Sequence, residues 1–219
     1  MKVIAFYLPQ FHEIEENNKM WGKGFTEWTN VKKAKPLFDG HYQPVAPLND
    51  NYYNLLDNKV LKWQVELAKR FGIYGFCFYH YWYNGHKLLE KPVDKFLDDK
   101  SLDLPFCICW ANHKWTQAWV SKEDNVLYEQ DYTDKSDWES HFQYFLKFFK
   151  DKRYMVNNNK PLLVIYLIAR NSSYVEMLDY WQQRAKESGF DGIDFALQET
   201  DSFLMLNKDN DRFSYLIEY

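Results

Sequence analysis

The feature that most constrains the fold is the alternation of short apolar runs with stretches of helical period. Each run has the length of a strand and few polar residues, which is typical of strands covered on both faces in a parallel sheet. The stretches between them carry apolar residues at the spacing of an amphipathic helix. The pattern predicts an α/β fold of repeated strand–helix units. We expect strands at residues 3–8, 73–79, 106–110, 162–168, 193–197 and 213–218, with helices near 58–71, 92–99, 138–149 and 174–188.

Two architectures are compatible with this pattern, an open doubly wound sheet and a (β/α)8 barrel of the TIM type. An open sheet usually has a glycine-rich turn after its first strand, whereas here the first strand runs into Pro9 and a polar, aromatic-rich segment. A first loop as long as residues 10–57 is uncommon unless it binds or catalyses. We therefore favour an incomplete (β/α)8 barrel, a single domain over residues 1–219 with about six of the eight βα units.

Composition excludes several classes of function. Lys and Arg number 27 against 31 Asp and Glu, and the net charge of −4 is not gathered in blocks, so we expect no nucleic-acid partner. No apolar run approaches the roughly 20 residues of a membrane-spanning helix. Cys77, Cys107 and Cys109 lie inside apolar runs, as buried thiols do, rather than in a disulfide framework or a metal motif. We expect a cytoplasmic protein without metal or cofactor.

Hydrogen-bonding and aromatic residues follow the predicted strands. In a parallel barrel these positions share the carboxyl-terminal rim, where active sites lie. Flat rings cover the C–H faces of a sugar, and amide, imidazole and carboxyl groups bind its hydroxyls, so the mixture points to carbohydrate. The alternative is that the rings pack under the long loop. The candidate substrate-binding residues, which we expect to meet at one rim, are His12, Glu27, Trp28, His80, Tyr81, Trp82, Trp110, Asn112 and Gln198.

Sugar chemistry usually requires a pair of carboxyl groups, and the chain offers few candidates. Glu27 lies in the long first loop, whereas Glu199 and Glu218 lie at strand ends. Each also has a structural interpretation, such as binding loop amides or capping a helix. No paired motif at defined spacing selects among them, so the catalytic residues stay open.

Several motifs occur in order along the chain, namely FYLPQFH at residues 6–12, WGKGFTEWTNV at 21–31, GHYQP at 40–44, GIYGFCFYHYW at 72–82, LPFCICWAN at 104–112 and FKDKRY at 149–154. Together they resemble the WbsX-type glycosyltransferase family, whose members are also described as glycoside hydrolase family 99-like. The resemblance runs from residue 3 to the last residue. It implies a (β/α)8 barrel that acts on carbohydrate in bacterial surface polysaccharide (O-antigen or capsule) biosynthesis or processing, by glycosyl transfer or hydrolysis.

Two departures limit what the resemblance implies. Where the family usually has Glu-Asn-Trp-Thr-Arg, this chain has His113-Lys114-Trp115-Thr116-Gln117, so a family ion pair through the arginine cannot form here. The late Asn-Glu-Trp-type segment that carries the family's catalytic carboxylates is absent, and two strands of the barrel are missing. We expect the amino-terminal part of a longer protein, whose partner is the missing carboxyl-terminal portion of the barrel. The alternative function is a non-catalytic sugar-binding remnant.

Overall fold

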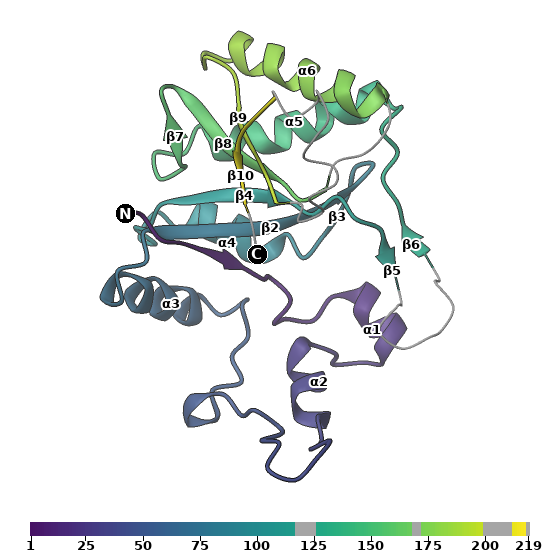
Figure 1. The fold of residues 1–219 in the computed structure, drawn as a ribbon, viewed down its shortest axis with the longest axis vertical. Helices are drawn as coiled ribbons and strands as arrows, with labels where there is room; N and C mark the ends of the chain where they lie inside the picture. The colour runs from purple at the N-terminus through teal and green to yellow at the C-terminus, as the bar shows by residue number, and fades with distance from the viewer. Residues whose placement is uncertain (117–125, 168–171, 199–211, 218–219) are drawn as a thin grey trace.

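The computed structural model describes residues 1–116, 126–167, 172–198 and 212–217. Its main sheet contains six parallel strands in the order β1-β2-β4-β8-β9-β10, so neighbours in the sheet are also successive in the chain (Figure 1). The strands are β1 (Ile4–Tyr7), β2 (Gly75–Tyr83), β4 (Phe106–Trp110), β8 (Lys160–Ile165), β9 (Asp194–Leu197) and β10 (Phe213–Leu216). This curled parallel sheet confirms the predicted α/β fold and its incomplete barrel.

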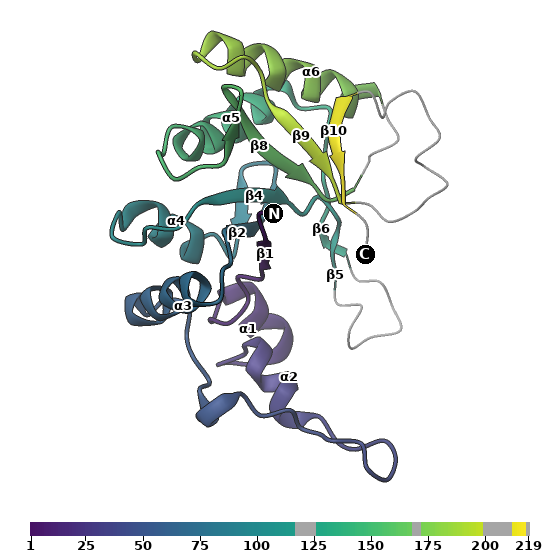
Figure 2. The same ribbon diagram turned by 60° about the vertical axis from the view of Figure 1, so that its left-hand side comes forward.

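Four helices cover one face of the sheet, which we call the outer face (Figure 2). They are α3 (Asn58–Arg70), α4 (Lys91–Asp98), α5 (Lys135–Phe149) and α6 (Ser172–Glu187). Local chemistry sets their ends: the Asp57 carboxylate accepts from the backbone N–H of Lys59, and Asp134 accepts from the N–H groups of the first turn of α5. Beyond α3, Gly72 takes a φ of 73°, which a residue with a Cβ rarely adopts.

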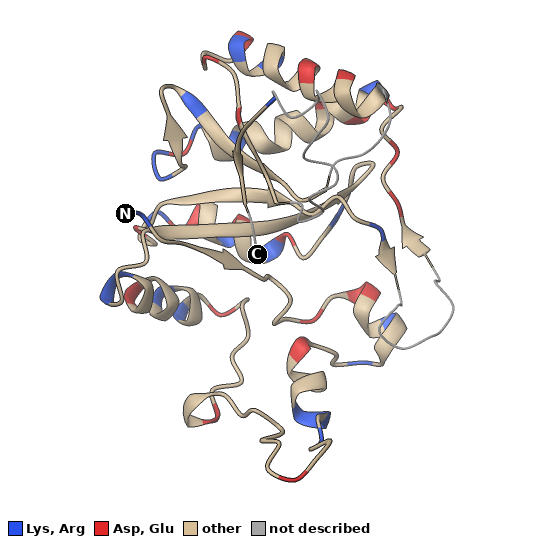
Figure 3. Ribbon diagram, viewed as in Figure 1, with Lys and Arg blue, Asp and Glu red and all other residues tan. Residues whose placement is uncertain are grey.

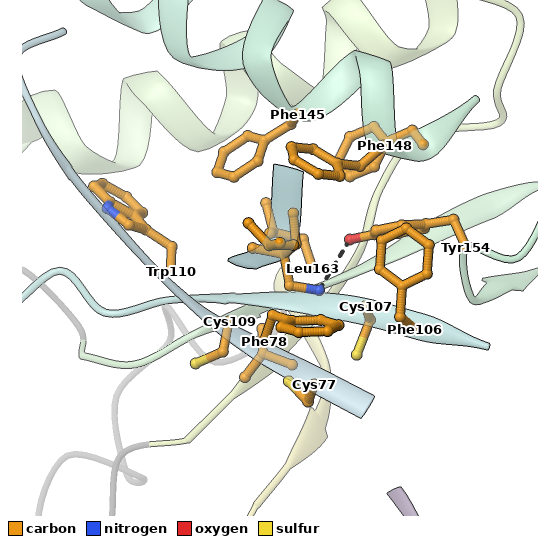
Figure 4. Packing of buried hydrophobic residues seen from close by; sticks show 14 of the residues in the cluster. Cys77, Phe78, Phe106, Cys107, Cys109, Trp110, Phe145, Phe148, Tyr154 and Leu163 are labelled. Carbon is orange, nitrogen blue, oxygen red and sulfur yellow. Dashed lines mark hydrogen bonds between the residues drawn. The ribbon is translucent and has the colours of Figure 1, made fainter. Parts of the chain in front are cut away.

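Side chains alternate between the two faces of the sheet, and the side chains on the two faces differ in size. Phe78, Phe106 and Trp110 point outward and pack against rings of the helices, such as Phe96 and Trp181. The sulfur atoms of the three buried cysteines lie on the other, inner face of the sheet, away from Phe145 and Phe148 of α5 (Figure 4). The core therefore lies mainly between the sheet and the helices, where the large rings exclude water.

Arg153 joins the end of α4 to the segment that follows α5. Its guanidinium donates to the backbone oxygens of Leu97, Asp99 and Leu102, at 2.9 to 3.0 Å, where α4 ends. It also makes two hydrogen bonds of 2.9 Å to the carboxylate of Asp151, whose side chain is only 3% exposed. Arg153 and Lys100 hold the pKa of Asp151 well below its usual range. The FKDKRY motif is thus a structural link between α4 and the segment after α5.

The sequence analysis treated the long segment between β1 and α3 as a loop, and the structure shows that this loop has helices of its own. It contains α1 (Glu15–Trp21), α2 (Glu27–Lys33) and a short 3₁₀ helix, η1 (Leu48–Asp50). Short strands also extend the sheet locally: β3 (His86–Leu88) pairs antiparallel with β2, and β7 (Val156–Asn157) with β8. β5 (Trp115–Thr116) and β6 (Val126–Tyr128) form a separate hairpin. α1, α2 and this hairpin lie near the carboxyl ends of the strands (Figure 1).

Charged residues are spread over helices and loops rather than gathered on one face (Figure 3). Within the described residues, no helix is long and apolar enough to cross a membrane. The same residues contain no group of three or more His, Cys, Asp or Glu side chains arranged to hold a metal ion.

Candidate functional site

A cleft of about 690 Å³ lies where β1, β2, β4 and β8 end. This is the carboxyl-terminal rim, where the fold predicts a binding site. One part of its lining comes from residues at the strand ends, namely Leu8, Gln10, Tyr79, Tyr81, Ala111, His113 and Tyr166. The rest comes from α1, α2 and the β5 segment, namely Asn17, Met20, Trp21, Phe25, Glu27, Asn30, Lys114, Trp115 and Thr116.

Aromatic rings form opposite sides of this cleft. Tyr81 meets the edge of Trp115 at 5.1 Å between ring centroids, and its hydroxyl accepts a hydrogen bond from Gln10 Nε2 at 3.3 Å. Trp21 and Phe25 stack on each other at 5.2 Å, on the side built by the long segment. Rings with polar groups at their edges suit a ligand that has both apolar faces and hydroxyl groups.

Glu27 brings a carboxyl group into the cleft. It is the first residue of α2 and is half-buried, and burial raises its pKa above the usual range. Among the described residues, no cation forms an ion pair with it, and no other Asp or Glu lines the cleft. A half-buried carboxyl without a cation is suited to binding a ligand hydroxyl or to transferring a proton.

Histidine 113 contributes a second titratable group to the lining. Its ring lies between those of Tyr81 and Tyr166, at 6.0 and 5.3 Å, and burial lowers its pKa. The imidazole is therefore neutral near pH 7. The residue that the sequence showed only as a departure from the family pattern thus faces the cleft.

Three predicted binding residues belong to the core instead. β2 continues to Tyr83, so His80 and Trp82 are strand residues on the outer face rather than a loop after the strand. His80 Nε2 lies 2.9 Å from His141 Nε2, and Trp82 donates to the carboxylate of Asp137. Trp110 is 1% exposed and packs against Trp181. α5 and α6 cover all three, so none of the three lines the cleft.

Other predicted residues hold the rim together without lining the cleft. Asn112 uses its amide to join two strand ends: Nδ2 donates to the Leu167 carbonyl, and Oδ1 accepts from the Leu167 N–H, each at 2.8 Å. Trp28 donates to the Tyr53 carbonyl at 2.8 Å and packs on Phe11, which fixes α2 to the end of the long segment. Neither side chain is placed to bind a ligand in the cleft.

His12 and Gln198 are also buried. Burial lowers the pKa of the His12 imidazole to about 4, so this ring is neutral. Gln198 Nε2 donates to the hydroxyl of Tyr79 at 2.6 Å, behind the cleft wall. Trp82 faces outward and Gln198 inward, so the predicted residues do not all meet at one place, and of them only Glu27 and Tyr81 line the cleft. Glu199, Glu218 and Gln117 lie outside the described residues.

The sequence interpretation missed Trp21, Phe25, Tyr79 and Tyr166. For Tyr79 a signal existed, because it lies two residues before Tyr81 and therefore on the same face of a strand. Tyr166 directly follows β8, so its place at a strand end was also a signal. For Trp21 and Phe25 no short-range signal existed, since their place in the cleft depends on how the long segment folds back.

The curled parallel sheet, its outer helices and the cleft at the strand ends define a (β/α)-barrel protein. The chain belongs to the WbsX glycosyltransferase family, whose family model, "Glycosyltransferase WbsX", matches residues 3–218. It is 38% identical over 194 residues to an uncharacterized protein, WxcX, in two strains of Xanthomonas campestris pv. campestris, B100 and ATCC 33913. The match covers 89% of this chain but only 28% of WxcX.

Solved structures show the same fold. An endo-alpha-mannosidase of family GH99 from Bacteroides thetaiotaomicron superimposes with a TM-score of 0.52 at 14% identity, over 99% of this chain and 60% of that chain. A glycoside hydrolase-like protein gives a TM-score of 0.51 at 14% identity, over 91% and 52% of the two chains. At these identities the likeness concerns the fold alone.

Proposed function

We propose that this chain is the cleft-bearing part of a carbohydrate-active protein that acts in bacterial surface polysaccharide (O-antigen or capsule) biosynthesis or processing, in the cytoplasm. The observation that carries the proposal is Glu27, a half-buried carboxyl without a cation partner in a cleft walled by aromatic rings. Membership of the WbsX family and a fold shared with glycoside hydrolases support it. The reaction is glycosyl transfer or glycoside hydrolysis.

In this proposal the ring of Trp115 covers the C–H face of a sugar, supported by an edge contact with the Tyr81 ring, which is 3% exposed, while Gln10 binds the sugar's oxygens. Glu27 with its raised pKa keeps a proton more readily than an exposed carboxyl and donates it to the leaving oxygen. Glycoside hydrolysis uses a second carboxyl group, either as the nucleophile that attacks the anomeric carbon or as the base that activates water. Glu199 and Glu218 remain candidates for that role.

A binding protein without turnover is the second candidate, because Glu27 is the one carboxyl that lines the cleft among the described residues. The two candidates differ in whether the chain turns glycans over, and Glu27→Gln tests the catalytic one. Loss of a catalytic acid lowers turnover by about 100-fold or more while sugar affinity changes little. In a binding protein, the wild-type chain binds glycans and turns none of them over.

The experiment measures binding to a bacterial glycan array and release of reducing sugar from the bound glycans. Trp115→Ala removes one wall of the cleft, and we expect about 5- to 30-fold weaker binding, from a stacking contribution of about 1–2 kcal/mol. Trp63→Ala and Glu66→Gln are matched controls, since both residues lie on α3 outside the cleft. A folded chain that binds no glycan, or binds one equally well after Trp115→Ala, would contradict the proposal.

A further inference from the structure

A second hollow in the surface lies on the other side of α2 from the cleft. It has a volume of about 430 Å³, and no residue of its lining also lines the cleft. We call it the α2 groove and define it by five of its lining residues, namely Trp28, Lys32, Lys33, Tyr52 and Tyr53. The long segment between β1 and α3 therefore builds one wall of the cleft and, separately, this groove.

The helical period of α2 explains how one short helix serves two hollows. Residues three or four apart lie on the same face of a helix. Trp28 and Lys32 are four apart and share the groove side. Glu27 and Asn30 are three apart and share the cleft side. The one acidic residue of α2 thus faces the cleft, whereas both of its lysines line the groove.

Aromatic rings form part of the wall of the α2 groove. Trp28 meets the rings of Tyr52 and Tyr53 edge-on, at 5.3 and 5.0 Å between ring centroids. The indole N–H of Trp28 donates to the Tyr53 carbonyl, which fixes the orientation of the ring. All three side chains are only partly buried. Rings that are held in place and partly open suit the C–H faces of a sugar.

The α2 groove is also positively charged, and no Asp or Glu lines it. The last turn of α2 carries Lys32 and Lys33 (Figure 3), and Lys32 Nζ lies 4.1 Å from the centroid of the Tyr52 ring. Residues 23–35 contain four exposed lysines and one acid, Glu27 on the cleft side. None of the four forms an ion pair with a described residue. In a chain with a net charge of −4, this local excess of unpaired positive charge attracts an anion.

We propose that the α2 groove binds an acidic saccharide, whose sugar rings lie against Trp28 and Tyr52 and whose anionic oxygens pair with Lys32 and Lys33. The choice of a saccharide rests on the proposed function, which assigns sugar to the cleft on the other side of α2. Carboxylate groups of a uronic acid and phosphate groups on a neutral sugar present the same anionic oxygens to an ammonium group. The groove therefore selects acidic glycans over neutral ones.

The test is isothermal titration calorimetry on the full chain with matched pairs of oligosaccharides. One pair is oligogalacturonate and its methyl ester, and the other is a phosphorylated mannan oligosaccharide and the same compound after phosphatase treatment. We expect one acidic probe to bind at least tenfold more tightly than its neutral counterpart. Its affinity should fall as the salt concentration rises, because salt screens exposed charges. The pair that shows the difference identifies carboxylate or phosphate as the source of the anion.

Substitutions assign this binding to the α2 groove. Lys32→Gln with Lys33→Gln should weaken binding of the acidic probe about 3- to 30-fold, from two exposed ion pairs. Tyr52→Leu keeps an apolar side chain and removes the ring, and we expect a further loss of about 2- to 10-fold. Lys59→Gln with Lys62→Gln is the matched control, because it removes the same charge from exposed positions of α3 outside the groove.

Four results would overturn the proposal. The first is equal affinity for the acidic and neutral members of both pairs, and the second is equal weakening by the two double lysine variants. The third is polyphosphate, an anion without sugar rings, binding as tightly as the acidic probe. The fourth is tighter binding to phosphatidylglycerol vesicles that the Lys32 and Lys33 variant abolishes, which would assign the groove to a membrane surface.

Failure of the proposed function gives a different pattern. No glycan binding would then depend on Trp115, whereas Lys32→Gln with Lys33→Gln would still weaken binding of the acidic probe. If the groove alone fails, Trp115→Ala weakens glycan binding and the lysine variant leaves it unchanged. The cleft and the α2 groove are therefore tested separately.

Discussion

Replacing Arg153 with Met tests whether this side chain holds α4 to the segment after α5. The change removes three hydrogen bonds to backbone oxygens and the paired hydrogen bonds to Asp151, while it keeps most of the side-chain volume. Removing one partner of a buried ion pair costs about 3–5 kcal/mol, and here the exposed Lys100, 2.5 Å from Asp151, still compensates part of the remaining charge. The carbonyl hydrogen bonds overlap with this cost, so we expect about 4 kcal/mol in total.

The assay is thermal unfolding followed by circular dichroism. For a chain of this size about 1 kcal/mol corresponds to about 2–4 °C, so the melting temperature should fall by about 8–16 °C. Lys152→Met is the control, since Lys152 is the exposed neighbour of Arg153. Equal melting temperatures for the two variants would refute the reasoning.

The pH dependence gives a second check on Arg153. The pKa of Asp151 is lowered in the folded chain, so the unfolded chain takes up the proton first as pH falls. The stabilisation by the pair is therefore complete above about pH 4, the usual Asp range, and is lost below it. The difference in unfolding free energy between wild type and Arg153→Met should shrink from pH 7 to pH 3. A difference that stays constant would mean that Asp151 does not contribute.

Three further predictions concern the core and the rim. Burial lowers the pKa of His80 to about 3 and that of His141 well below its usual range, so the unfolded chain binds more protons below about pH 6.5 and stability falls with acid. Replacing both histidines with Phe should make the unfolding free energy fall less steeply with acid, by up to about 1.4 kcal/mol per pH unit for each histidine. The measurement is urea unfolding at pH 7, 6 and 5, and an unchanged pH dependence of the unfolding free energy would contradict this prediction. Gly75→Ala should lower the unfolding free energy by about 1–3 kcal/mol, because the new Cβ would overlap the carbonyl oxygen of Pro105. If a second substitution that makes a neighbouring side chain smaller restored the stability, the backbone would not be the obstacle. Asn112→Leu should cost about 2–4 kcal/mol from its lost and unsatisfied hydrogen bonds; a melting temperature equal to that of the wild type would argue against the amide bridge.

The sequence was informative where one element alone decides the outcome. The apolar run at 106–110 predicted β4 with its observed bounds, and the helical period near 58–71 predicted α3. These features depend on neighbours in the chain. The same is true of the overall α/β class, since it follows from repeated local patterns.

The site was harder to predict because buried polar groups resemble ligand-binding groups in sequence. His80 was predicted to follow a strand, yet its partner His141 lies 61 residues away and lets an imidazole stay inside the core. Asn112 is bonded across 55 residues in the same way. Only the folded chain shows these distant partners, whereas Glu27 has no such partner among the described residues.

The order of the strands bears on how such a chain forms during synthesis. Among the described strands of the main sheet, each pairs with the main-sheet strand made just before it, so none of these pairings waits for a distant later strand. A nascent polypeptide leaving the ribosome can therefore add one strand and its helix at a time to a preformed template. At any moment the exposed edge of the growing sheet is the newest strand, and that is where a chaperone would be most useful.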